Sequence, residues 1–234
     1  MEETMEYSES IENIDDNNDV SAAVDEDDDD DESEIKTTAE VLTEVTNAWL
    51  NEKFAPEILQ HKSEYVDCLL LQISHMEDNI KKKLTSNDMR LFIYQQEIDR
   101  IRYIVSSYLR IRLLKIERYV INILKEESER NEDERLLTPA ELQFAKNYAM
   151  NMETLLKSVV LQHLPPTLQE FEIEKLAVSP NLHAHVIMKA NKKIDGVIIP
   201  GPTDEEVDFE EDSVHIISYK AISHYIKTGD IQLI

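Results

Sequence analysis

The chain has 234 residues and a formal net charge of −25, from 49 Asp and Glu against 24 Lys and Arg. The chain has only three Gly, and 6% of its residues are aromatic. This low content disfavours β-sandwiches, barrels and nucleotide-binding Rossmann units. No apolar run approaches the length of a membrane-spanning helix, and the acidic N-terminus lacks the basic start of a signal peptide. We therefore expect a soluble, mainly α-helical protein.

The first 34 residues are strongly acidic. They hold 17 of the 49 acids and no Lys or Arg, so the remaining 200 residues carry 32 acids, 24 bases and a net charge of −8. Such a segment cannot bury a core, and we predict that residues 1–34 form a disordered acidic tail. Within it, Ile11 and Ile14 are spaced for one helical turn and form a candidate partner-binding peptide. A solvating tail with chance isoleucines is the alternative.

A helical domain is predicted for residues 35–164. Its first helix begins at a capping box formed by Thr37 and Glu40, and carries Trp49 on its apolar face, with Phe54 following. A second helix begins at Ser63 and ends at a lysine cluster, residues 81–83.

The single cysteine of the chain, Cys68, lies among apolar residues of the second predicted helix. It has no cysteine partner for an internal disulfide. We expect it to be a small buried core residue in a reducing intracellular compartment.

One very long helix is predicted over residues 87–127, which contain no Gly and no Pro. At about 1.5 Å per residue it would span roughly 60 Å. Its apolar side chains cover an arc of roughly 220°, whereas a one-sided amphipathic helix needs about 100°. Both flanks are therefore expected to face protein. The residues that define the arc are Ile98, Ile101, Val105, Tyr108, Leu109, Leu113, Ile116, Val120 and Leu124.

Three cations, Arg102, Arg112 and Lys115, fall inside the same arc. Buried charge is costly unless it is paired, so we expect carboxylate partners from another helix or another chain. For Arg102 and Lys115, a side chain that reaches solvent from the edge of the arc is an equal alternative.

The end of the helical domain contains a predicted linker and clear helix start and stop signals. Residues 126–135 are charged and aperiodic, and we interpret them as a solvated linker. Thr138, Pro139 and Glu141 then combine a capping box with Pro at the first helical position. The helix that follows ends before Pro165, and the four helices suffice for a bundle.

After a linker over residues 165–182, the periodicity changes. Residues 183–234 are expected to form a small β-rich domain, whose own core is marginal and which must dock on something. The apolar last residue, Ile234, indicates a terminus tied into a sheet. Strands are expected at 185–190, 197–199, 214–217 and 231–234, with a short helix at 220–227.

No pattern in the chain indicates catalysis. His183 and His185 would share a strand face, but no Cys or third His supports a metal site. There is no phosphate-binding Gly-rich loop and no nucleophile motif, so we expect no enzyme activity and no cofactor. The cations of the long helix scatter around its axis, which disfavours nucleic-acid binding as the main function.

Five segments, taken in order, resemble the Sld-five type of the GINS family of eukaryotic DNA replication proteins. They are WLNEKFAPEIL (49–59), IDRIRYIVSSYLRIRLLKIE (98–117), LTPAE (137–141), LQHLPP (161–166) and GDIQLI (229–234). The resemblance covers about residues 37–234 and leaves out the tail.

The resemblance implies a non-catalytic scaffold subunit of a nuclear heterotetramer with the Psf-one, Psf-two and Psf-three subunits. That complex joins Cdc-forty-five to the MCM ring to form the active replicative helicase, with DNA contact at most indirect. In some members of the family, an N-terminal peptide of the kind seen at Ile11 and Ile14 binds the replisome hub Ctf-four.

Candidate partner-binding residues follow, because aromatic residues and Arg are frequent interface anchors. They are Trp49, Phe54, Arg102, Tyr103, Tyr108, Arg112, Lys115 and Ile234. The alternative function is that of an acidic, histone-chaperone-like protein, in which residues 25–32 bind basic histones.

Overall fold

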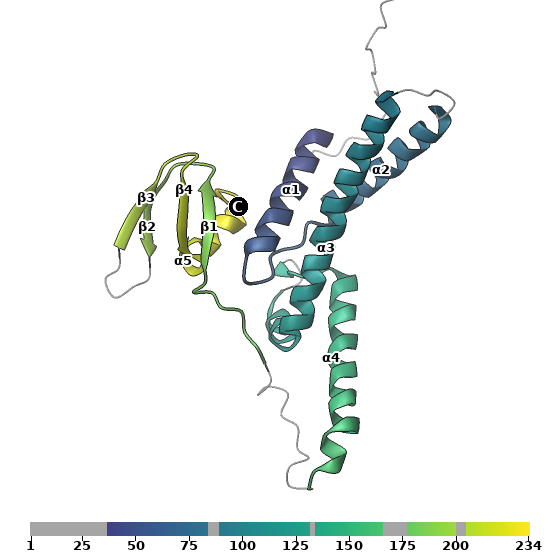
Figure 1. The fold of residues 1–234 in the computed structure, drawn as a ribbon. Coiled ribbons are helices and arrows are strands. Elements are labelled where there is room, and N and C mark those ends of the chain that lie inside the picture. Colours follow the sequence, from purple (N-terminus) through teal and green to yellow (C-terminus); the bar gives the residue numbers. More distant parts are fainter. Residues whose placement is uncertain (1–36, 84–88, 132–133, 166–176, 200–204) are drawn as a thin grey trace, which may run out of the picture. The chain divides into compact units, whose positions relative to one another are not determined.

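The structure is a computed structural model that describes residues 37–83, 89–131, 134–165, 177–199 and 205–234. The candidate peptide at Ile11 and Ile14, and most of the predicted linker 165–182, lie outside these ranges. The predicted fold class, a mainly α-helical chain with one very long helix and a small β-rich C-terminal part, is confirmed (Figure 1).

The helical part contains α1 (Thr38–Phe54), α2 (Ser63–Lys83), α3 (Met89–Glu129) and α4 (Pro139–Val159), followed by the 3-10 turn η2 (Leu161–His163). Both predicted capping boxes are present. The Thr37 side chain accepts from the Glu40 backbone N–H, and Thr138 accepts from that of Glu141. The side chain of each glutamate in turn accepts a hydrogen bond from the backbone N–H of its threonine. Both helices therefore begin where the capping boxes predict.

The long helix α3 has 41 residues, with a local kink at Tyr119 (φ −118°, ψ 23°). It continues two residues past its predicted end, so the interpretation of 126–135 as a solvated linker is wrong at its start. The reason is Glu127, which is buried and accepts a hydrogen bond from the Leu136 backbone N–H at 2.9 Å. That carboxylate holds the turn that follows α3.

Two hydrophobic cores line α3. Its first half packs with α1 and α2 around residues such as Val45, Leu69 and Ile98. Its second half packs with α4 around Ile116 and Ala145. Leu109 and Leu113, which belong to the predicted apolar arc, are exposed, so this chain covers only part of the arc by itself.

Cys68 is exposed, and the expectation that it is a core residue is wrong. The buried face of α2 is set by Val66, Leu69 and Ile73. At about 100° per residue, Cys68 lies more than a quarter turn away from the centre of that face. Apolar neighbours in sequence are not neighbours on a helix face.

The C-terminal part contains a three-stranded antiparallel sheet of order β4–β1–β5 and a separate β2–β3 hairpin. The bounds are β1 (His185–Ala190), β2 (Ile194–Ile199), β3 (Glu205–Phe209), β4 (Val214–Ser218), α5 (Tyr219–Thr228) and β5 (Ile231–Leu233). Residues of α5 and the inner face of the sheet form one core. The strand β3 was not predicted, because its acidic residues hide the alternation of Val207 and Phe209.

This module contacts the end of α1. Ala55, just after α1, belongs to the core of the module, and the Leu233 backbone N–H donates to Asn51 Oδ1 at 2.8 Å. The Ile234 N–H donates to the Ile187 carbonyl at 3.1 Å, which confirms that the terminus is tied into the sheet. No helix within the described ranges is long and apolar enough to cross a membrane.

Candidate functional site

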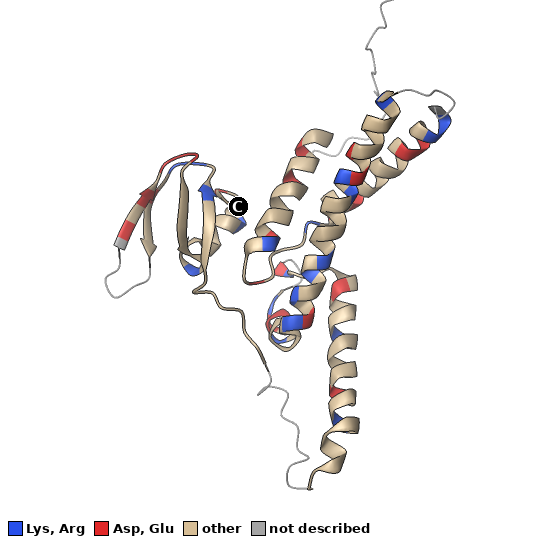
Figure 2. Cartoon of the chain, in the orientation of Figure 1, with Lys and Arg blue, Asp and Glu red and all other residues tan. Residues whose placement is uncertain are grey.

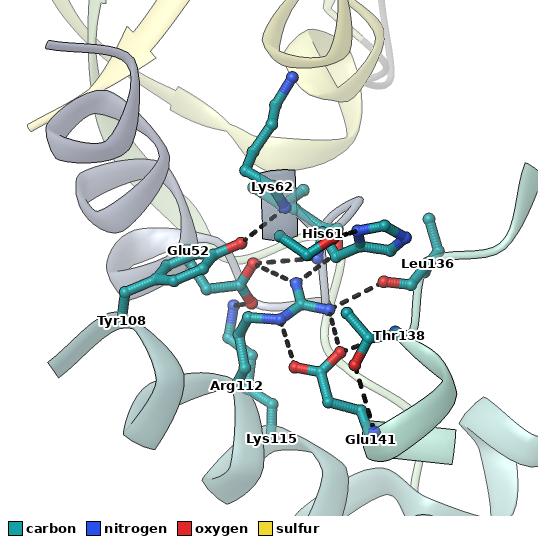
Figure 3. A network of polar contacts seen from close by, with 11 residues as sticks. Glu52, His61, Lys62, Tyr108, Arg112, Lys115, Leu136, Thr138 and Glu141 are labelled. Atoms are coloured by element: carbon teal, nitrogen blue, oxygen red, sulfur yellow. Dashed lines mark hydrogen bonds and ion pairs between the residues drawn. The ribbon is translucent and has the colours of Figure 1, made fainter. Parts of the chain in front are cut away.

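Arg112 lies at the centre of a buried polar network that joins four segments of the helical part (Figure 3). Its side chain is 1% exposed. The guanidinium donates to both carboxylate oxygens of Glu141, at 2.7 and 3.0 Å, and to Glu52 Oε2 at 3.2 Å. It also donates to the backbone carbonyls of Leu59 and Leu136, each at 2.8 Å. All five N–H groups of the guanidinium therefore have an acceptor.

Lys115 lies one turn further along α3 and completes the charge balance. Its Nζ donates to Glu52 Oε1 at 2.8 Å and to the Glu57 carbonyl at 2.7 Å. Burial lowers the pKa of Lys115 despite the attraction of Glu52. Two cations and two carboxylates thus neutralise each other, with Glu52 bridging both cations.

Glu141 has two roles that its position at the start of α4 combines. It closes the capping box through the Thr138 N–H at 3.0 Å, and it receives the Arg112 fork. Burial by itself would raise the pKa of Glu141, but the bonds from Arg112 and Thr138 outweigh it and hold that pKa below its ordinary value. The first turn of α4 is therefore locked onto α3.

The network extends toward the C-terminal module through Glu57. The Tyr219 hydroxyl donates to Glu57 Oε1 at 2.8 Å, and burial, followed by the nearby Glu57 charge, raises the pKa of Tyr219. Tyr108 accepts from the Lys62 N–H at 3.3 Å, and its ring lies 5.7 Å from the Arg112 guanidinium carbon. Burial is the main cause of the raised pKa of Tyr108.

This arrangement is suited to holding segments together. Its charged groups are saturated by one another and by backbone carbonyls, as buried charges must be. Among the residues that the structure describes, no group of three or more His, Cys, Asp or Glu is placed to bind a metal ion.

The sequence left open whether the carboxylate partners of Arg102, Arg112 and Lys115 come from another helix or another chain. The carboxylates expected for Arg112 and Lys115 come from other helices of this chain, and the Arg112 side chain has almost no surface through which to contact a partner directly. Arg102 forms an ion pair with Glu77 of α2, again within the chain, and remains half exposed.

The other sequence-predicted residues do not form one cluster. The Trp49 Nε1–H donates to Ser107 Oγ at 3.0 Å, and its ring meets the Tyr103 ring edge-on at 6.3 Å. Tyr103 is 65% exposed, and Phe54 and Ile234 are also exposed. Tyr108 is buried. A partner-binding role for these residues stays a prediction.

Sequence reasoning missed Glu52 and the exposed part of α4. Glu52 looked like one of many acids, and only the packing of α1 against α3 buries it. Beyond Met152, no residue of α4 belongs to the described cores, although Leu155 and Val159 continue its apolar spacing and are exposed. That spacing was visible in the sequence, but it does not say which turns of the helix the chain itself covers.

Comparison with known proteins gives the family. Residues 57–160 match the family model described as "GINS complex protein helical bundle domain", and residues 180–234 match "DNA replication complex GINS protein SLD5 C-terminus". The chain belongs to the SLD5 family of GINS proteins. The resemblance stated from the sequence is confirmed, and the match to the helical bundle model includes all of the Arg112 network except Glu52 and Tyr219.

Curated SLD5 relatives are similar over most of their length. The chain is 42% identical over 208 residues to "DNA replication complex GINS protein SLD5" of Xenopus laevis, covering 87% of this chain and 94% of the relative. It is 40% identical to the Bos taurus protein and 39% identical to the Homo sapiens protein of the same name, each covering 87% of this chain and 93% of the relative. SLD5 proteins are subunits of the GINS complex in DNA replication, and this chain is one of them.

Proposed function

We propose that this chain is a non-catalytic scaffold subunit of a nuclear GINS heterotetramer. Its direct partners are the Psf-one, Psf-two and Psf-three subunits. Through the complex it reaches Cdc-forty-five and the MCM ring, so that an active replicative helicase forms during initiation and fork progression. DNA contact is at most indirect, and the tail peptide at Ile11 and Ile14 is the candidate contact to the Ctf-four hub.

The observation that carries this proposal is the apolar surface left exposed on long helices. Leu155 and Val159 extend an apolar row of α4 past the last core residue, and Leu114 and Tyr103 lie on the outer side of α3. Isolated exposed apolar residues are ordinary, but rows of them on an otherwise charged chain mark protein interfaces.

The buried Arg112 network also supports a scaffold role. A scaffold must present its interface helices at fixed angles, and the network joins the end of α1, the middle of α3 and the start of α4. Within this proposal, Arg112 and Lys115 contribute to assembly by holding the helices that partners contact.

The test is the mass of the full-length chain, purified alone and then co-expressed with the three other GINS subunits. We expect aggregation of the lone chain and a 1:1:1:1 complex upon co-expression. A well-behaved monomer that ignores the three subunits would refute the proposal.

A paired variant sharpens this experiment. Leu155→Glu with Val159→Glu places two charges on the exposed apolar row and should reduce recovery of the complex. Asn147→Glu with Asn151→Glu adds the same charges with the same four-residue spacing on exposed polar positions of α4, and should not. Equal recovery of both would show that the row is not an interface. Deletion of residues 1–34 should leave assembly intact.

A further inference from the structure

The two outer edges of the sheet β4–β1–β5 differ in how the described part of the chain covers them. At the β5 edge, the Leu233 N–H donates to Asn51 Oδ1 at 2.8 Å and the Gln232 side chain donates to Asn47 at 2.9 Å, so α1 closes that edge. At the β4 edge, the described part of the chain supplies no neighbouring strand.

The hydrogen bonds around β4 show which of its backbone groups face outward. The Ala190 N–H donates to the Ser213 carbonyl at 3.0 Å, and the Tyr219 N–H donates to the Ala184 carbonyl at 2.9 Å. Successive residues of a strand direct their N–H and C=O to opposite sides, so Val214 and Ile216 present theirs to the outer edge. Two residues therefore offer a ladder for a further strand.

The side chains at this edge are apolar and exposed. Val214 is 57% exposed and Ile216 is 72% exposed, and Ile187 lies opposite Ile216 in the β1–β4 register and is also exposed. Natural proteins usually shield an edge strand with Lys, Pro or a bulge, because an unshielded one pairs with other chains. The β4 sequence VHIIS has neither Lys nor Pro, and its register with β1 is regular.

The surroundings of β4 are acidic. Among the described residues, β2, β3 and the turn before β4 include six acids, which are Asp195, Glu206, Asp208, Glu210, Glu211 and Asp212. Figure 2 shows acidic residues along β3 and the turn toward β4. Two neighbouring lysines neutralise part of this charge: Lys189 pairs with Asp212 at 2.7 Å and Lys193 pairs with Asp195 at 2.8 Å. Such a surface attracts cationic segments and repels acidic ones.

We infer that the outer edge of β4 binds an extended, basic peptide segment of a partner protein as a fourth strand of this sheet. Strand addition takes its affinity from main-chain hydrogen bonds and its specificity from alternate side chains. The segment would carry apolar residues at every second position, to cover Val214 and Ile216, with Lys or Arg between them. This inference does not depend on which subunits complete the helical part.

The probe is an eight-residue, fluorescent, end-blocked peptide of alternating Lys and Val. It is titrated by fluorescence anisotropy into the full-length chain, alone and co-purified with the three other GINS subunits, so failed assembly and failed peptide binding are separate results. An alternating Glu and Val peptide should not bind.

Two comparisons separate strand addition from attraction by the acidic N-terminal tail. Ile216→Lys and Ile198→Lys add the same charge to exposed isoleucines of this module, 72% and 62% exposed, but only Ile216 lies on the β4 edge. We expect the first to weaken binding about tenfold, and the second less than about threefold. A Lys–Val peptide N-methylated at two consecutive residues loses an N–H from each edge and should bind the unaltered chain about tenfold more weakly.

Equal weakening by the two lysine substitutions, or unchanged binding of the N-methylated peptide, would overturn the inference, since binding would then be electrostatic only. Binding by the lone chain but not by the complex would overturn it too, because another subunit would then cover the edge. If Ile216→Lys fails to fold, as judged by circular dichroism, the N-methylated probe alone decides the question.

Discussion

Replacing Arg112 by Met tests the buried network directly. The substitution keeps an apolar stem of similar length but removes five hydrogen bonds, and it leaves Glu52 and Glu141 without the Arg112 charge. Removing one partner of a buried ion pair costs about 3–5 kcal/mol, because the remaining charge stays desolvated. A domain of ordinary stability has about 5–15 kcal/mol in total. Arg112→Met should therefore unfold in far less urea than the unaltered chain.

The pH dependence of the loss follows from Glu141. In the unaltered chain its pKa is lowered below the ordinary value of 4.5, so its contribution is complete above that pH and is lost as pH falls through the lowered pKa. In Arg112→Met the main donor is gone while burial remains, so the pKa of Glu141 should rise. The difference in unfolding free energy between the two proteins should then shrink from pH 7.5 to pH 5.

The assay is urea unfolding of the full-length proteins, followed by circular dichroism at both pH values. The control is Arg100→Met, which removes a half-exposed arginine paired with Glu97 one turn away and should cost less than about 1 kcal/mol. A cost of less than about 1 kcal/mol for Arg112→Met, equal at both pH values, would refute the reasoning, because it would mean that the network is solvated.

Three further substitutions probe single features by the same urea assay. Tyr219→Phe removes the donor to Glu57 and should cost about 1 kcal/mol. Because the pKa of Tyr219 is raised, the unaltered chain should lose stability as pH rises above about 10, and a variant with the same alkaline loss would contradict this. Gly229→Ala should cost about 1 kcal/mol from backbone strain alone, since φ is +84° and an added Cβ meets no atom within 4 Å; a neutral result would show that the turn relaxes. Thr138→Ala should cost about 1 kcal/mol through the lost cap of α4, and no loss would mean that Glu141 alone holds the helix start.

Features encoded by near neighbours in the chain were predictable. The capping boxes at Thr37 and Thr138 place the starts of α1 and α4, because donor and acceptor are three residues apart. The length of α3 follows from the absence of Gly and Pro, and the alternation over residues 185–190 predicts β1. The candidate site was predictable only in part: burial of Arg112 required carboxylates, but the sequence assigned Glu141 only a capping role and did not identify Glu52 or Glu141 as the partners of Arg112.

The remaining features depend on which element packs where. Cys68 and Leu69 are adjacent in the chain, yet only Leu69 faces α3, because a helix turns about 100° per residue. Glu127 lies in a charged run, and the sequence therefore predicts that it is solvated. In the structure, the turn after α3 places the Leu136 N–H within hydrogen-bonding distance of its carboxylate. The sequence by itself determined the elements, their caps and the need to neutralise Arg112, since these depend on local spacing and on the cost of desolvation. Only the tertiary structure decided which carboxylates meet Arg112 and which apolar residues stay exposed, because both depend on contacts between residues far apart in the chain.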